Sequence, residues 1–281
     1  MLIKAIICDH DHPERGLVTV PLPIPKEQYD QCVERVQALG IGDPLKKDCM
    51  VMELDSFFSV LKITEGRCVN LDELDYLAKR LDSFDDGEAV QFQAMASKLE
   101  LFELKDLINL TFCCQQATVI TDFSDLEAVG RRHVLTASGG HMPVDELAQV
   151  DGRKEALKLI LNEPGTITPY GVVYDNGMEL EQLYREGGPF PEYVDRQYSM
   201  LLEASAGEGQ STLLLLPDSQ ARLERLLGRA GIQYSSQVRF RVVDNTLPGA
   251  VFNSIPVEHL PILGLNRLCQ AAERIAPEER I

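Results

Sequence analysis

The sequence predicts an α+β protein with four parts: a small α/β module, an acidic helical bundle, a middle β/α segment, and a C-terminal α/β module repeating the first. Two observations lead to this prediction. Apolar runs of strand length, bounded by glycine and proline, occur near both ends of the chain. Amphipathic helix patterns follow one another between residues 70 and 130. We place the four parts at residues 1–67, 68–134, 135–210 and 211–281.

The N-terminal module has a strand–strand–helix–strand order. Leu2–Ile7 and Leu17–Leu22 are apolar strand candidates. Pro25 suits the first position of a helix extending to Leu39, because its ring presets a helical φ and this position needs no N–H donor. Cys49–Leu54 is the third strand candidate.

The helical bundle begins at Asn70, whose side chain is expected to form a reciprocal N-cap with Glu73. Apolar stripes at helical spacing predict this helix and three more up to residue 130. The stretch 70–130 holds 13 acids against four bases, a net charge of −9 in a chain whose total is −17. We therefore expect the polar helix faces of this block to form a concentrated anionic surface.

The remaining chain divides into a middle segment and a second α/β module. Asp145–Leu161 is expected to be helical, and Glu203–Gln210 has the composition of a linker. A strand at Thr212–Leu216, a helix and a strand at Val238–Val243 then follow the order of the first module. Because matching elements lie about 191 residues apart, we predict an internal duplication. The alternative is that two unrelated stretches share common turn residues.

The bulk charge bears on partners. An isoelectric point near 4.7 and a net charge of −17 argue against direct binding to nucleic acid or to an anionic membrane, since both would be repelled. The seven cysteines show no CxxC spacing and fit small buried hydrophobes in a reducing compartment. The first apolar run is too short for a signal peptide, so a cytoplasmic location is expected.

One string resembles a metal site. On an extended strand Cys8, His10 and His12 would point to one side, with donor atoms that suit zinc. A polar turn after a strand explains the string equally well, because Pro13 and Gly16 follow at once. No other grouping has the spacing of a catalytic motif. We therefore expect neither an enzyme nor a bound metal or cofactor.

Three strings resemble ArdA-type antirestriction proteins, which are carried by conjugative plasmids and transposons. The segment from Asn70 to Asp82, NLDELDYLAKRLD, is similar to the family signature LxELNxLAxxL. Leu104–Thr111 and Asp125–Gly130 resemble the next two family strings, in order and with suitable spacing. The resemblance covers roughly residues 1–135, and no family string matches the middle segment or the C-terminal module.

The resemblance implies a function. Members of the family are elongated acidic proteins that mimic B-form DNA and occupy the DNA-binding groove of type I restriction–modification enzymes, and they form homodimers. Carboxylates on a rigid scaffold can take the place of phosphates, which duplex DNA presents at about one per 1.7 Å of its axis. The partner-binding acids expected from this hypothesis lie on the outward faces of the bundle: Asp72, Glu73, Asp75, Asp82, Asp85, Asp86, Glu88, Glu103 and Asp106.

Two features of the sequence favour a different hypothesis. Four bases, Lys79, Arg80, Lys98 and Lys105, are interspersed among these acids, and the C-terminal module is almost neutral. The alternative is a non-enzymatic interaction or scaffold protein of a mobile element, in which the acidity serves solubility.

Overall fold

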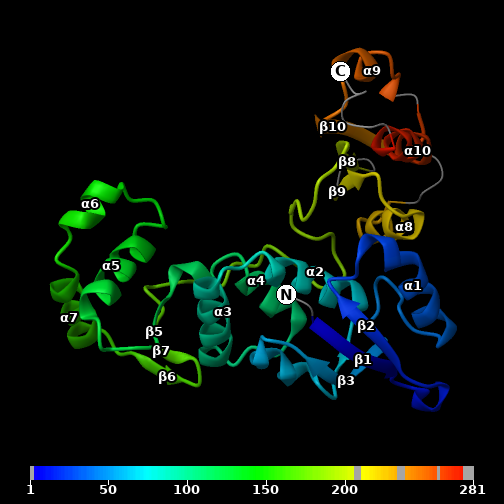
Figure 1. Ribbon diagram of the computed structural model, residues 1–281. Helices are drawn as coiled ribbons and strands as arrows, with labels where there is room; N and C mark the ends of the chain where they lie inside the picture. Colours follow the sequence, from blue (N-terminus) through cyan, green and yellow to red (C-terminus); the bar gives the residue numbers. More distant parts are fainter. Residues whose placement is uncertain (1–2, 206–209, 233–237, 258–259, 275–281) are drawn as a thin grey trace.

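The computed structural model describes residues 3–205, 210–232, 238–257 and 260–274, so Leu2 of the first predicted strand lies outside the described residues. Helices and antiparallel sheets are both present, as an α+β fold requires. Figure 1 shows a bent molecule: an N-terminal sheet and a central group of helices form the body, an arm extends from one end, and the C-terminal module stands above the other.

The N-terminal sheet has four antiparallel strands in the order β2-β1-β3-β4. Their bounds are β1 Ile3–Asp9, β2 Val18–Leu22, β3 Cys49–Asp55 and β4 Cys68–Val69. The three predicted strands are present, whereas the predicted helix starts later. Pro25 precedes a 3-10 turn at Lys26–Gln28, and α1 covers Tyr29–Ala38. Further 3-10 turns lie at Pro13–Arg15, Ser59–Thr64 and Cys114–Gln116.

The central helices are α2 (Leu71–Asp82), α3 (Asp86–Lys98) and α4 (Leu104–Leu110). Their apolar stripes share one continuous hydrophobic core with the N-terminal sheet. Asn70 caps α2 as expected, since its Oδ1 accepts from the backbone N–H of Glu73 at 3.1 Å. The Glu73 carboxylate points elsewhere, so the expected return bond is missing. The reciprocal box occurs at α3, between Asp85 and Glu88.

The arm contains a small antiparallel sheet and three helices. The sheet has the order β5-β7-β6, with β5 at Thr118–Ile120, β6 at Thr166–Thr168 and β7 at Gly171–Tyr174. The helices are α5 (Leu126–Ala137), α6 (Val144–Gln149) and α7 (Gly152–Asn162). We expected α5 to complete the bundle, but it packs mainly against α7 (Figure 1). Gly130 and Gly152 face each other at the crossing, which brings the two backbones into direct contact.

The C-terminal module has its own hydrophobic core. Its sheet has the antiparallel order β10-β8-β9, with β8 at Met200–Ser205, β9 at Ser211–Leu216 and β10 at Arg239–Asn245. Its helices are α8 (Gln220–Arg229), α9 (Gly249–Phe252) and α10 (Ile262–Glu273). The linker predicted at 203–210 is wrong at its start, because residues 203–205 belong to the central strand of this sheet. Residues 206–209 lie outside the described part.

The first and last modules share features beyond element order. In each, the first strand lies between the other two, as β2-β1-β3 and β9-β8-β10. Asp75 Oδ1 accepts from the backbone N–H of Ile24 at 2.6 Å, just after β2. Asn266, 191 positions after Asp75, accepts from the N–H of Asp218 at 2.9 Å, just after β9. These parallels support the internal duplication, which stays a prediction.

All seven cysteines are free thiols, and six of them are buried, as expected for small hydrophobes. Burial raises the pKa of the Cys32 thiol to about 11. Among the described residues, no helix combines the length and the apolar character needed to cross a membrane.

Replacing Gly130 by alanine is expected to destabilise the arm. A Cβ atom at this position would lie 1.7 Å from the carbonyl oxygen of Gly152, so α5 and α7 would have to separate. We expect a loss of about 1–3 kcal/mol in the free energy of unfolding, measured by urea denaturation. Gly228→Ala in α8 is the matched control, because its Cβ would meet open space and should be neutral or stabilising. Equal effects of both substitutions would contradict the close crossing.

Mild acidification should also destabilise the arm, because it favours protonation of His133. The Nδ1 atom of this residue lies 3.0 Å from Thr118 Oγ1, and that hydroxyl already accepts a bond from Asn176 at 2.9 Å. The hydroxyl proton is therefore available to a neutral imidazole. Desolvation lowers the pKa of His133 below its usual 6.5, against the opposing charges of Glu163 and Glu155.

Because the unfolded chain takes up the proton more readily, stability falls as the pH drops through about 6.5 and stops falling below the lower folded-state pKa. We expect the thermal midpoint of the wild type to drop more between pH 7 and pH 5 than that of His133→Gln. The exposed His10→Gln variant should follow the wild type. A His133→Gln variant with the wild-type pH dependence would exclude this residue as the cause.

Candidate functional site

The acids expected to form the partner surface divide into two groups. Asp72, Glu73 and Asp75 are buried, with exposed fractions of 8%, 1% and 4%. The prediction that these three face outward is wrong. The polar face of α2 is covered by α8 of the C-terminal module and by the segment that leads from the arm to that module.

The other six acids lie nearer the surface. Asp82, Asp85 and Asp86 are exposed, whereas Glu88, Glu103 and Asp106 are partly exposed. Glu103 pairs with Lys47 at 3.0 Å. These six can still belong to a partner surface, although Asp85 and Glu88 also cap α3.

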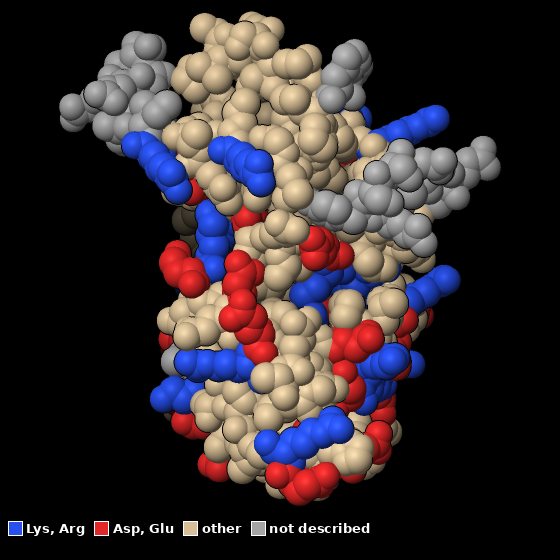
Figure 2. Space-filling view, turned by 90° about the vertical axis from the view of Figure 1, so that its right-hand side faces the viewer, with Lys and Arg blue, Asp and Glu red and all other residues tan. Residues whose placement is uncertain are grey.

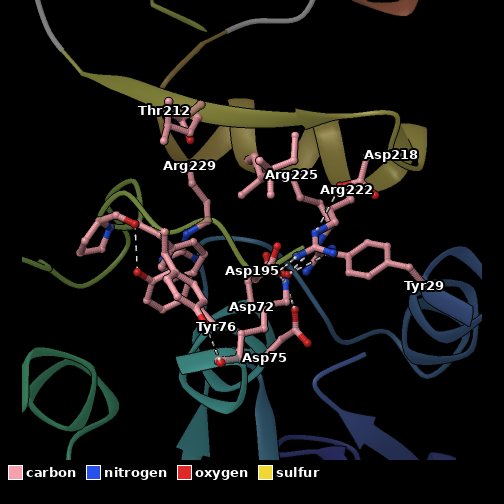
Figure 3. Close-up of a pocket in the computed structure, with 17 residues that line it drawn as sticks. Tyr29, Asp72, Asp75, Tyr76, Asp195, Thr212, Asp218, Arg222, Arg225 and Arg229 are labelled. Atoms are coloured by element: carbon pink, nitrogen blue, oxygen red, sulfur yellow. Dashed lines mark hydrogen bonds and ion pairs between the residues drawn. The ribbon is translucent and has the colours of Figure 1, made fainter. Parts of the chain in front are cut away.

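Three arginines of α8 cover the acids of α2. Arg222, Arg225 and Arg229 occupy positions i, i+3 and i+7, which lie on one helix face. All three are buried. Figure 3 shows them pointing from α8 toward Asp72, Asp75 and Asp195. These arginines were not among the site residues predicted from the sequence, although the spacing R-x-x-R-x-x-x-R could have revealed them.

Arg225 holds the middle of the contact. Its Nε donates to Asp72 Oδ1 at 3.0 Å, and its Nη1 donates to the carbonyl oxygen of Gly42 at 2.7 Å. The Tyr29 hydroxyl donates to the same Asp72 oxygen at 3.4 Å. Desolvation raises the pKa of Asp72, and the positive charge of Arg225 opposes this shift. Arg225 thus stabilises the charged form of this carboxylate.

Arg229 is enclosed more completely. Its Nη2 lies 3.5 Å from Glu73 Oε1 and also donates to the Tyr184 hydroxyl, which in turn donates to Glu73 at 2.6 Å. The guanidinium stacks on Phe190 with its carbon 4.2 Å from the ring centre. It donates in addition to three groups of the surrounding loops: Asn70 Oδ1 and the carbonyl oxygens of Pro44 and Gly188.

Arg222 is the first arginine of the row, in the N-terminal half of α8. Its Nη2 is 3.3 Å from Asp195, its Nε is 3.6 Å from Asp218, and its guanidinium lies over the ring of Tyr29. Lys79 joins this end, since its Nζ lies 2.8 Å from Asp75 and 3.5 Å from Asp195. Burial raises the pKa of Asp75 and of Asp195. Each acid therefore has at least one cation as a neighbour.

A cavity of about 70 Å³ remains between the two helices. Three buried atoms here have no hydrogen-bond partner among the described residues: Asp72 Oδ2, Asp195 Oδ1 and Arg225 Nη2. The contact therefore contains many charged groups, but some of their hydrogen-bonding atoms have no partner. Such unpaired polar atoms cost free energy in a low dielectric.

The bases that were expected to dilute the acidic surface have mostly internal roles. Lys79 belongs to the contact just described. The Arg80 guanidinium lies over the rings of Phe112 and Tyr193 and donates to the carbonyl oxygen of Thr111 at 3.0 Å. Lys98 pairs with Asp175 at 2.5 Å.

The exposed acids lie farther along the chain than expected, from the end of α2 into the arm. Residues 82–192, all of which the structure describes, contain 20 acids and eight bases, a net charge of −12. None of these 20 acids is buried. We use the name acidic surface for the acids of residues 82–192. Figure 2 looks at the opposite end of the molecule, where acids and bases alternate.

The string Cys8, His10 and His12 does not come together. Cys8 is buried in β1, whereas both histidines are exposed. Asp9 closes a turn by accepting from the backbone N–H groups of Asp11 and His12. The polar-turn explanation therefore accounts for the string.

Comparison with known proteins adds no relationship: no protein-family model matches the chain, and no curated protein matches it.

Removing Arg229 is expected to destabilise the protein strongly. Arg229→Met leaves Glu73 and two carbonyl oxygens without their cation. We expect a loss of about 3–5 kcal/mol in the free energy of unfolding, measured by urea denaturation. Arg239→Met, at an exposed position of β10, should change stability by less than about 0.5 kcal/mol. The double variant Glu73→Leu/Arg229→Met should recover part of the loss. A loss below about 1 kcal/mol for Arg229→Met would mean that the pair behaves like a surface ion pair.

Proposed function

We propose that this protein binds a type I restriction–modification enzyme by presenting its acidic surface as a mimic of B-form DNA, as the resemblance to ArdA-type proteins implies. The observation that carries this proposal is the charge of residues 82–192: 20 acids, none of them buried, against eight bases. These residues form the end of the body and the arm (Figure 1).

The physical basis is the exchange of counterions. Ion pairing between a basic groove and fixed carboxylates releases counterions from the two surfaces, as pairing with phosphates releases the cations condensed on DNA. The arm also gives the acids a spread-out arrangement, because α5 to α7 project away from the two α/β modules (Figure 1). An extended row of charges is better suited to a long groove than a compact patch.

A groove of about 790 Å³ between the start of α3 and α5 adds a docking place. Its lining has three acids, Asp85, Asp86 and Glu88, against one base, Arg132, and includes apolar residues such as Phe112. Acidic and apolar groups together suit the long side chains of arginine and lysine, whose stems are apolar and whose ends are charged.

The burial of Asp72, Glu73 and Asp75 changes the expected site. Asp72 and Glu73 are paired internally with arginines of α8, and Asp75 is paired with Lys79, so the proposed partner surface begins at Asp82 and extends through the arm. The remaining exposed acids therefore favour residues C-terminal to α2 as the partner surface.

The test is a variant in which four acids of the acidic surface are replaced by their neutral amides. Asp86→Asn, Asp145→Asn, Glu146→Gln and Glu181→Gln change four exposed acids without touching the capping box. We expect inhibition of DNA cleavage by a purified type I enzyme to weaken about tenfold or more at moderate salt. The salt dependence of binding should also become shallower, as it does when phosphate contacts are removed.

The matched control neutralises four exposed acids of the N-terminal module: Asp30→Asn, Glu34→Gln, Glu53→Gln and Asp55→Asn. This control has the same net charge as the test variant, but it should inhibit the enzyme as strongly as the wild type does. Equal loss in both variants would mean that only total charge matters. If the wild type does not bind the enzyme even at low salt, the proposal fails, and the scaffold hypothesis becomes the better one.

A further inference from the structure

We propose that the face of α2, together with the segment around Tyr184 and Phe190, is a binding surface for an arginine-bearing helix, which α8 occupies within the same chain. We call these residues the guanidinium surface: Asn70, Asp72, Glu73, Asp75, Tyr184, Phe190 and Asp195. An arginine-bearing helix of another protein would compete with α8 for this surface. It is separate from the acidic surface, which begins at residue 82.

Recognition is specific for arginine rather than for positive charge. Arg229 uses its planar face on Phe190 and its edge for Glu73 and Tyr184. Arg225 directs two different nitrogens to Asp72 and to the carbonyl of Gly42. A lysine ammonium has neither a flat face nor a fork of donors, so it could replace only part of these contacts.

The spacing of the arginines also matters. The acids Asp72 and Glu73 lie in the first turn of α2, whereas Asp195 comes from the segment after the arm, so the surface has separate places for three side chains. Positions i, i+3 and i+7 of one helix reach them together. The surface therefore fits a helix with this pattern.

Two properties make α8 exchangeable. The C-terminal module and the rest of the protein have different hydrophobic cores, and α8 is packed into the core of its own module through Leu223 and Leu227. The helix can therefore move away from α2 together with its module, whose core stays closed. Among the described residues, the contact leaves two atoms of this surface, Asp72 Oδ2 and Asp195 Oδ1, without a hydrogen-bond partner beside the 70 Å³ cavity. A helix that satisfied these atoms would bind better than α8 does.

The experiment uses full-length protein and a labelled peptide as the probe. The peptide has the sequence of Ser219–Gly231, which includes all three arginines, and binding is followed by fluorescence anisotropy. The variant Arg222→Gln/Arg225→Gln/Arg229→Gln, which we call the vacated variant, lacks the three guanidinium groups that occupy the surface. We expect the peptide to bind this variant about tenfold or more tightly than the wild type, a difference of about 1.4 kcal/mol.

A matched control removes three arginines outside the contact: Arg239→Gln, Arg241→Gln and Arg267→Gln, all exposed in the same module. It should bind the peptide no better than the wild type. A peptide with lysine in place of the three arginines should bind the vacated variant more weakly. Adding Asp72→Asn and Glu73→Gln to the vacated variant should remove the gain.

The proposal is overturned by any of three results: equal affinity for the vacated variant and the wild type, equal affinity of the arginine and lysine peptides, or no effect of Asp72→Asn and Glu73→Gln. Circular dichroism checks that the vacated variant folds. If it does not fold, the variant Arg222→Lys/Arg225→Lys/Arg229→Lys replaces it in the test. This variant keeps the three positive charges but weakens the contact of α8 with the surface. This variant should bind the arginine peptide more tightly than the wild type does, and an unchanged affinity would equally overturn the proposal.

Discussion

Three buried guanidinium groups of α8 lie against the carboxylates of α2 and join two hydrophobic cores that do not merge. Apolar contact alone would allow many relative orientations of the two parts, because it has no direction. Arg225 and Arg229 instead bind named oxygen atoms of Asp72, Glu73 and the loop carbonyls. The position of the C-terminal module therefore depends on hydrogen-bond geometry, and a buried charge without its partner would be costly.

This contact also decides where the charge of the protein appears. The acids at the start of α2 pair with the arginines of α8 and are buried beneath that helix, whereas every acid from residue 82 to residue 192 retains exposed surface. Acidic residues thus have two separate roles in one chain. Those of α2 hold the modules together, and those of the central helices and the arm set the external field that a basic partner would meet.

The segment after the arm connects these two roles. It leaves β7, passes along α2 and enters β8, and on the way Tyr184 and Phe190 become part of the enclosure of Arg229. Asn109 of α4 fixes this path, since its side chain bonds both the N–H and the carbonyl oxygen of Tyr184. The direction in which the chain returns from the arm is therefore tied to the same interface as the C-terminal module.

The sequence by itself determined the features that depend on near neighbours. Period-two and period-3.6 patterns located β1 to β3, α2 and the cap at Asn70, because alternation, helical spacing and capping act within a few residues. The tertiary structure alone decided which side of α2 is hidden. An acid on a helix surface faces solvent unless another element covers it, and the covering arginines lie some 150 positions away from Asp72. The partner of α5 was hidden for a similar reason, although the separation is only 22 positions, because it is set by the contact of Gly130 with Gly152.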